Sequence, residues 1–158
     1  KFRKNKYSSS KISLELSKIK AKSISFSIKN KLIIGSDTVI DYKNSTIEKV
    51  SCFKEAQQKI KKLSGKKHTI ISSVAAYYNQ KLIWSDYEHT IVKLRKLNTL
   101  EINKYLNSCG PSIFNSVGCY QIEKNGPTII ENIEGDFFNV MGFPLFSFLK
   151  FLKKYQSK

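Results

Sequence analysis

Apolar residues recur along the chain at two alternating spacings. Helical spacing predicts helices over residues 8–25, 52–64, 99–109 and 144–156. Stretches rich in β-branched and aromatic residues predict strands over residues 31–42, 68–79, 82–97, 117–123 and 127–133. Because helices and strands alternate without a linker or a repeat, the pattern predicts one α/β domain with a mixed sheet.

The apolar positions also predict which face of each helix is buried. In the first helix, the residues at helical spacing are Ile12, Leu16 and Ile19. In the second, they are Phe53, Ala56, Ile60 and Leu63. In the closing helix, they are Leu145, Phe148, Leu149 and Leu152. We expect these side chains to form the core.

Residues with known roles at element ends predict several boundaries. Gly65 is a natural stop after the second helix. Asn98 with Glu101 three residues later resembles a capping box. Pro144 suits the first position of the closing helix, and residues 79–81 suit a hairpin turn.

The net charge of this 158-residue chain is +16, from 28 basic and 12 acidic residues. Such a balance attracts polyanions: nucleic acid, an anionic membrane or phosphorylated small molecules. The lysines are dispersed along the chain, which favours a general compositional bias over a dedicated nucleic-acid patch. We therefore expect no nucleic-acid partner.

The cysteines Cys52, Cys109 and Cys119 are odd in number, and no pair has the spacing of a metal site. This pattern is typical of reduced thiols in a cytoplasmic protein. No apolar stretch approaches the ~18 residues of a membrane span. We therefore expect a cytoplasmic protein without a membrane partner.

An ionisable residue, Asp37, interrupts the apolar strand predicted over residues 31–42. Burying a carboxylate costs several kcal/mol unless it is paired or bound to a metal. One explanation is that the strand ends there and Asp37 lies in a solvated turn. The other is that Asp37 lies at the mouth of a site, where it holds a divalent metal or activates water. The residues alone leave both explanations open.

Two further segments carry candidate chemistry. If residues 118–123 form a strand, Cys119, Gln121 and Glu123 share one face. Gln121 and Glu123 could then read a base edge, complete a metal site or face solvent. Residues 133–140 contain two acidic residues, Glu134 and Asp136, but such a segment is more typical of a loop that sets the entry of the next helix.

Other motifs indicate less. His68 and His89 lie far apart in predicted strands and have no third partner for a triad or a zinc site, so we interpret both as structural. The sequence contains no glycine-rich phosphate loop and no dinucleotide fingerprint.

Several short motifs together resemble the Maf family. They are Gly35–Val39 (GSDTV), Leu63–His68 (LSGKKH), Gly118–Glu123 (GCYQIE), Ile133–Asp136 (IEGD) and Gly142–Leu145 (GFPL). Each is weakly specific alone, but their order and spacing match over nearly the whole chain. The resemblance implies that residues 1–158 form a single two-lobed α/β domain, with a mixed, twisted sheet flanked by helices as in the inosine-triphosphatase-like fold.

The resemblance also implies an activity: hydrolysis of a nucleoside triphosphate to the monophosphate and pyrophosphate, with a divalent cation, Mg²⁺ or Mn²⁺. By position in the motifs, Asp37 is the catalytic base and a metal ligand, and Glu123 is a second candidate metal ligand. The implied substrate-binding residues are Lys20, Lys49, Thr38, Gln121 and Glu123. Family members are often dimers, so a homodimer is expected.

Two details refine these expectations. Ser116 and Glu123 resemble the subgroup that prefers 7-methyl-GTP, and a carboxylate could pair with the N–H donors of a guanine edge. The family also has an N-terminal strand and a Ser-x-Ser-x-x-Arg loop, which no segment of this sequence resembles. On that ground we expect a weakly active or inactive chain that is prone to self-association.

The residues therefore predict a site in which Asp37 lies at the cleft end of its strand, within reach of Lys20, Lys49 and Glu123. Two other classes of function compete with the enzyme. One is a non-catalytic regulator of septum formation, an activity associated with the family. The other is a basic nucleic-acid-binding module, which only the net charge suggests.

Overall fold

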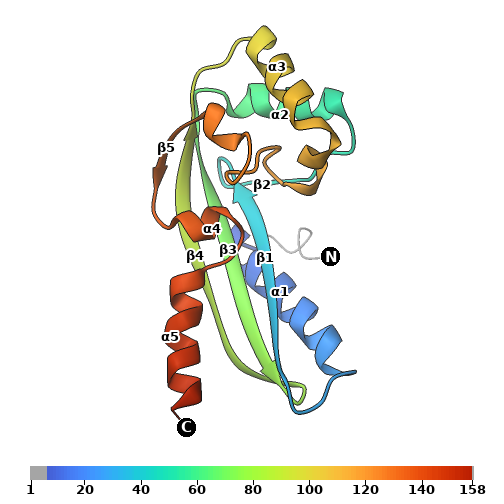
Figure 1. The fold of residues 1–158 in the computed structure, drawn as a ribbon, viewed down its shortest axis with the longest axis vertical. Helices are drawn as coiled ribbons and strands as arrows, with labels where there is room; N and C mark the ends of the chain where they lie inside the picture. Colours follow the sequence, from blue (N-terminus) through green and yellow to red (C-terminus); the bar gives the residue numbers. More distant parts are fainter. Residues whose placement is uncertain (1–6, 158) are drawn as a thin grey trace. The chain divides into compact units, whose positions relative to one another are not determined.

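The computed structural model describes residues 7–157, which form a five-stranded sheet with helices (Figure 1). The strands are β1 (Leu32–Asp41), β2 (Thr46–Ile47), β3 (Lys67–Tyr78), β4 (Lys81–Leu94) and β5 (Ile130–Glu134), in the order β2-β1-β3-β4-β5. The α-helices are α1 (Ser9–Ser25), α2 (Phe53–Leu63), α3 (Thr99–Cys109), α4 (Phe137–Val140) and α5 (Leu145–Gln156). Two short 3₁₀-helices, η2 and η3, span Gly110–Asn115 and Gly126–Thr128.

The chain divides into two compact units. Among the described residues, unit 1 contains 7–39, 71–89 and 136–157, and unit 2 contains 40–70 and 90–135. Helices α1, α4 and α5 belong to unit 1, and helices α2 and α3 belong to unit 2.

The sheet is antiparallel. Strands β1 and β2 pair in this direction, as do β4 and β5. Strands β3 and β4 form a hairpin whose two turn residues, Asn79 and Gln80, both have positive φ, as type I′ turns require. Figure 1 draws β1 and β3 in opposite directions. The α/β class with flanking helices is confirmed. Strand direction differs from the mixed sheet expected, because a hydrophobic pattern locates strands but does not reveal which way they run.

In unit 1, helix α1 buries a face of small residues in addition to the predicted Ile12 and the partly buried Leu16. The buried positions recur every four residues: Ser9, Ser13, Ser17, Ala21 and Ser25. Ile12 is also buried, in a cluster with Val39 and Ile71, but Ile19 is 50% exposed. Since residues four apart lie on one face of a helix, this stripe of small side chains lets the helix backbone approach the sheet closely.

Helix α5 packs through aromatic side chains. The ring of Phe151 stacks on Trp84 with 4.6 Å between centroids, and Phe148 lies 6.3 Å from the same indole. Phe148 therefore packs as predicted, but Leu149 is 47% exposed, so the predicted position of Leu149 in the core is wrong. Trp84 selects the helix face by offering a flat apolar surface to rings.

In unit 2, helices α2 and α3 pack against each other and lie side by side in Figure 1. Helix α2 buries three of its four predicted residues, Ala56, Ile60 and Leu63, whereas Phe53 is 42% exposed. The predicted capping box is confirmed: the Asn98 side chain accepts from the Glu101 amide, and the Glu101 carboxylate accepts from the Asn98 amide.

Residues 116–125 form turns, so the strand predicted over 117–123 is wrong. Cys119 has a φ of 58°, in the left-handed region, and Ser116 closes the turn by donating from its hydroxyl to the Tyr120 carbonyl at 2.5 Å. Cys119 is buried together with its neighbours Tyr120 and Ile122. The sequence alternation that suggested a strand does not correspond to an alternation of buried and exposed side chains.

Two expectations from composition can be compared with the described residues. Cys52, Cys109 and Cys119 are all free, as predicted. No helix within residues 7–157 is long and apolar enough to cross a membrane.

Candidate active site

Asp37 lies within β1, four positions before its last residue, Asp41. The strand continues through Asp37 without a break, so the prediction that Asp37 lies at a strand end is wrong. Its carboxylate is only 13% exposed and accepts a hydrogen bond from the Lys20 ammonium group, with 2.5 Å between Nζ and Oδ1. The lysine explains how a strand can hold a carboxylate here, because pairing offsets the cost of its desolvation.

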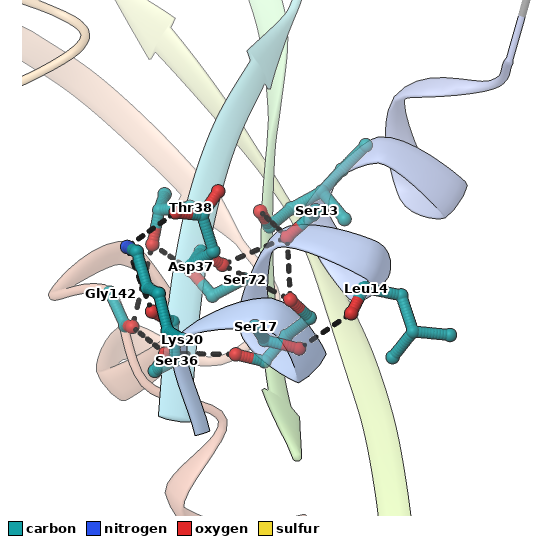
Figure 2. A network of polar contacts seen from close by, with 11 residues as sticks. Ser13, Leu14, Ser17, Lys20, Ser36, Asp37, Thr38, Ser72 and Gly142 are labelled. Carbon is teal, nitrogen blue, oxygen red and sulfur yellow. Dashed lines mark hydrogen bonds and ion pairs between the residues drawn. The ribbon is translucent and has the colours of Figure 1, made fainter. Parts of the chain in front are cut away.

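Lys20 reaches Asp37 because α1 and β1 lie almost in backbone contact (Figure 2). A Cβ atom added to Gly35 would lie 2.5 Å from the Ser17 carbonyl oxygen and 2.6 Å from the Ala21 nitrogen. Only glycine fits this space. The Lys20 ammonium group also donates to the carbonyl of Ser36 at 3.1 Å, so it is held at two points of β1.

Buried serines hold the backbone of Asp37 in place. The Ser13 hydroxyl lies 2.8 Å from the Asp37 carbonyl oxygen, and the Ser73 hydroxyl lies 3.3 Å from it. The two serines are fully buried and also bond to each other at 2.8 Å. Hydrogen bonds of this kind satisfy polar groups that have no access to water, and here they connect α1, β1 and β3.

The residues beside Asp37 point to the other face of the strand, since side chains alternate along β1. The Ser36 hydroxyl donates to the Gly142 carbonyl at 2.8 Å. The Thr38 hydroxyl bonds to that of Ser72 at 2.9 Å. The Thr38 hydroxyl thus has a partner within the protein, and its contact with a substrate stays a prediction.

The acidic segment before α5 makes structural contacts. Asp136 caps α4 by accepting from the Phe138 amide at 2.8 Å. Asn139 is fully buried, and its side-chain oxygen accepts from the Ser72 amide at 3.1 Å. In unit 2, Glu134 forms an ion pair with Lys67, which lowers the pKa of the Glu134 carboxyl. These contacts agree with the structural interpretation of the segment.

The network contains residues that sequence reasoning did not single out. They are Ser13, Ser72, Ser73 and Asn139, all fully buried. For Ser13 a signal was present, because serine recurs at positions 9, 13 and 17. Such a repeat places hydroxyls on one helix face, where they can bond to a sheet.

The remaining candidates belong to unit 2. Lys49 is exposed and lines a cavity of about 460 Å³ together with Lys59 and Lys62. Gln121 lines a separate cavity of about 340 Å³, and Glu123 is exposed. The structure thus brings Lys20 to Asp37, whereas the nearness of Lys49 and Glu123 to Asp37 stays a prediction.

Within the part of the chain that is described, no three His, Cys, Asp or Glu side chains gather to hold a metal ion. Asp37 offers one carboxylate, whose Oδ1 is already paired with Lys20. Mg²⁺ is commonly held by one or two carboxylates plus substrate phosphates. The residues around Asp37 therefore fit a cation that binds together with the substrate.

Both histidines fit the structural interpretation. His68 is buried, and its Nε2 lies 2.5 Å from the Tyr120 hydroxyl, while its Nδ1 has no partner among residues 7–157. Burial lowers the pKa of His68 to about 4. His89 is exposed, with its Nε2 3.0 Å from the Ser10 hydroxyl.

Comparison with known proteins identifies the family. Residues 1–155 match the family model described as Maf-like protein, so the chain belongs to the Maf family, as its motifs predicted. It is 39% identical to a 7-methyl-GTP pyrophosphatase of Bartonella quintana, over 87% of this chain and 70% of that protein. It is 37% identical to a 7-methyl-GTP pyrophosphatase of Bartonella henselae, over 92% of this chain and 73% of that protein. A nucleoside triphosphate pyrophosphatase of Caulobacter vibrioides is 32% identical, over 77% of this chain and 61% of that protein.

Proposed function

We propose that this protein is a nucleoside triphosphate pyrophosphatase, which releases a nucleoside monophosphate and pyrophosphate. The proposal rests mainly on the Lys20–Asp37 ion pair, which the close packing of α1 on β1 holds in place. Relatives of the chain in the same family are named for this activity. A carboxylate held next to an ammonium group combines the two things the reaction needs: a base for water and a positive charge for phosphate.

In the proposed reaction, Asp37 accepts a proton from water as the water oxygen bonds to the α-phosphorus. The bond between that phosphorus and the oxygen bridging to the β-phosphorus breaks, and pyrophosphate leaves. The Asp37 oxygen that does not face Lys20 has no partner among the described side chains, so it can accept the proton. Lys20 is 56% exposed, which leaves its ammonium group accessible to a phosphate oxygen as well.

For substrate binding we propose Lys49, Thr38, Gln121 and Glu123. Lys49 is supported by its cavity, in which three ammonium groups outnumber the acidic side chains Glu48 and Glu55. Such a surface favours a polyanion. Glu123 is exposed and could accept hydrogen bonds from the N–H donors of a guanine edge, which agrees with the two relatives named 7-methyl-GTP pyrophosphatase. We therefore propose a guanine nucleotide, methylated or not, as the preferred substrate.

We also propose a divalent cation, Mg²⁺ or Mn²⁺, that binds with the substrate. Asp37 would be its protein ligand if its free oxygen held the cation instead of taking the proton from water, and Glu123 is the second candidate. When bound, the cation would neutralise part of the phosphate charge. The proposal extends to a homodimer, which the family resemblance supports, and to a cytoplasmic location, which the free thiols of the three cysteines support.

The test is pyrophosphate release by the purified chain from 7-methyl-GTP, GTP, UTP and dTTP, each with Mg²⁺ and with Mn²⁺. We expect release to be fastest with the guanine nucleotides and to stop when a chelator removes the cation. Because no segment of the chain resembles the Ser-x-Ser-x-x-Arg loop, the same panel is run on a form extended at its N-terminus by that segment. If neither form yields pyrophosphate with either cation, the proposed function is wrong.

A further inference from the structure

Lys59, in the middle of α2, directs its charge into the protein. Its ammonium group donates to the carbonyl of Val117 at 2.9 Å and to the carbonyl of Glu48. The side chain is half-buried, and burial lowers the pKa of its ammonium group. Placing a lysine charge in such a position costs free energy unless its donors are satisfied. The two carbonyls provide that compensation.

The two carbonyls come from segments with little regular structure. Glu48 precedes Lys49 and lies just beyond the two-residue strand β2. Val117 begins the run of turns that leads to Gln121 and Glu123. Because ladder hydrogen bonds do not fix the backbone at these points, a side chain that spans them has a large effect on where they lie.

The position of Lys59 differs from that of the other two lysines of the same cavity. Lys49 and Lys62 are exposed, so their ammonium groups are accessible to a ligand. The donors of Lys59 face backbone oxygens, and Glu55, one turn earlier on α2, attracts its charge. Lys59 is therefore suited to fix the backbone segments that carry its two carbonyl partners, and Lys49 is suited to contact a ligand in the cavity.

We propose that Lys59 is a positioning residue for substrate binding, which ties the segment carrying Lys49 to the segment that begins at Val117. The inference rests on the proposed function, since it assumes that Lys49 contacts the triphosphate. Holding Lys49 in place before the substrate arrives reduces the entropy lost on binding. Loss of Lys59 should then weaken substrate binding more than the chemical step.

The first test uses Lys59→Met, which keeps the length of the side chain and removes its donors. With the best nucleotide of the panel, we expect KM to rise about tenfold while kcat changes less than about twofold, the pattern of lost ground-state binding. Lys59→Arg should restore most of the loss, because a guanidinium group can donate to both carbonyls. Lys61→Met, an exposed lysine of the same helix, is the matched control and should leave KM unchanged.

The second test is a double-mutant cycle with Lys49→Met, which separates positioning from direct contact. If Lys59 acts through Lys49, Lys59→Met should raise KM less than about twofold in the Lys49→Met background. Additive effects, or an unchanged KM in the single variant, overturn the inference. Thermal melts show which variants fold; should Lys59→Met not fold, Lys59→Gln replaces it in the same cycle. If neither the unmodified chain nor its N-terminally extended form releases pyrophosphate, the proposed function fails first, and the inference falls with it.

Discussion

The two lysine sites of this protein are built in different ways. In unit 1, Lys20 meets Asp37 because a stripe of small residues and Gly35 bring two regular elements into close contact. In unit 2, Lys59 itself holds two irregular segments through their carbonyls. Backbone packing determines the geometry of the first site, and a side chain determines that of the second. The first should therefore be sensitive to side-chain volume and the second to the loss of hydrogen-bond donors.

The largest effect should come from Asp37→Asn, which is nearly isosteric but removes the basic oxygen. We expect kcat to fall on the order of a hundredfold or more, the usual scale for a general base. Thermal stability should remain close to that of the unmodified chain. Asp41→Asn, on the same strand, is the matched control and should retain turnover. Near-normal turnover by Asp37→Asn would remove Asp37 from the mechanism.

Gly35→Ala tests the role of packing in unit 1. The added methyl group would overlap the backbone of α1, so the helix must shift and carry Lys20 with it. Overpacking of this kind costs roughly 1–3 kcal/mol of unfolding free energy, and turnover should fall as well. Gly110→Ala is the control: nothing lies within 4 Å of its added Cβ, although its φ of 61° carries a backbone cost. It should lower stability without a specific loss of turnover. A Gly35→Ala variant with full activity would contradict the packing account.

The buried His68 should make the stability of unit 2 depend on pH. Burial lowers its pKa to about 4 in the folded chain, against about 6.5 for an unperturbed histidine. The unfolded chain therefore takes up the proton first. The free energy of unfolding therefore keeps its full value above about pH 6.5. It falls by up to roughly 3 kcal/mol as the pH drops toward 4.

Urea unfolding at pH 7.5 and pH 4.5 measures this loss. His68→Gln should reduce the difference between the two pH values, because it removes the titrating ring. His89→Gln, which removes an exposed imidazole, should leave the difference unchanged. An equal pH dependence in all three proteins would show that His68 is not responsible.

The smallest effect should come from Asn98→Ala, which removes the side-chain cap of α3. Loss of an N-cap costs about 1 kcal/mol. We expect a small drop in the urea midpoint and an unchanged KM, because α3 is held mainly by its packing against α2. A rise in KM comparable to that of Lys59→Met would mean that any loss of stability in unit 2 weakens binding. The effect of Lys59→Met on KM would then not be evidence for positioning.

Elements whose ends are set by local chemistry could be predicted from the sequence. Helix α3 spans Thr99–Cys109 as predicted, because Asn98 and Glu101 form a box within four residues. The hairpin between β3 and β4 could also be predicted, because its turn residues are adjacent in the sequence. Asp37 was found because a carboxylate in an apolar strand is costly and therefore stands out.

Features that depend on tertiary contacts could not be predicted in this way. The buried stripe of α1 is made mostly of serines, which hydropathy counts as polar. Ser13 donates to strand carbonyls, whereas Ser17 and Ser25 donate to carbonyls of α1 itself. Residues 116–125 resemble a strand in pattern, but Cys119 takes a positive φ. Lys59 looks like one more surface lysine until its carbonyl partners are seen. For Ser13 and Lys59, the partners lie far along the chain.

The most direct test of the account is to run the reaction in ¹⁸O-labelled water and to measure the masses of the products by mass spectrometry. If Asp37 activates water for attack on the α-phosphorus, the label enters the nucleoside monophosphate, and the pyrophosphate carries none. Label in the pyrophosphate, or formation of a nucleoside diphosphate and inorganic phosphate instead, would contradict the proposed reaction.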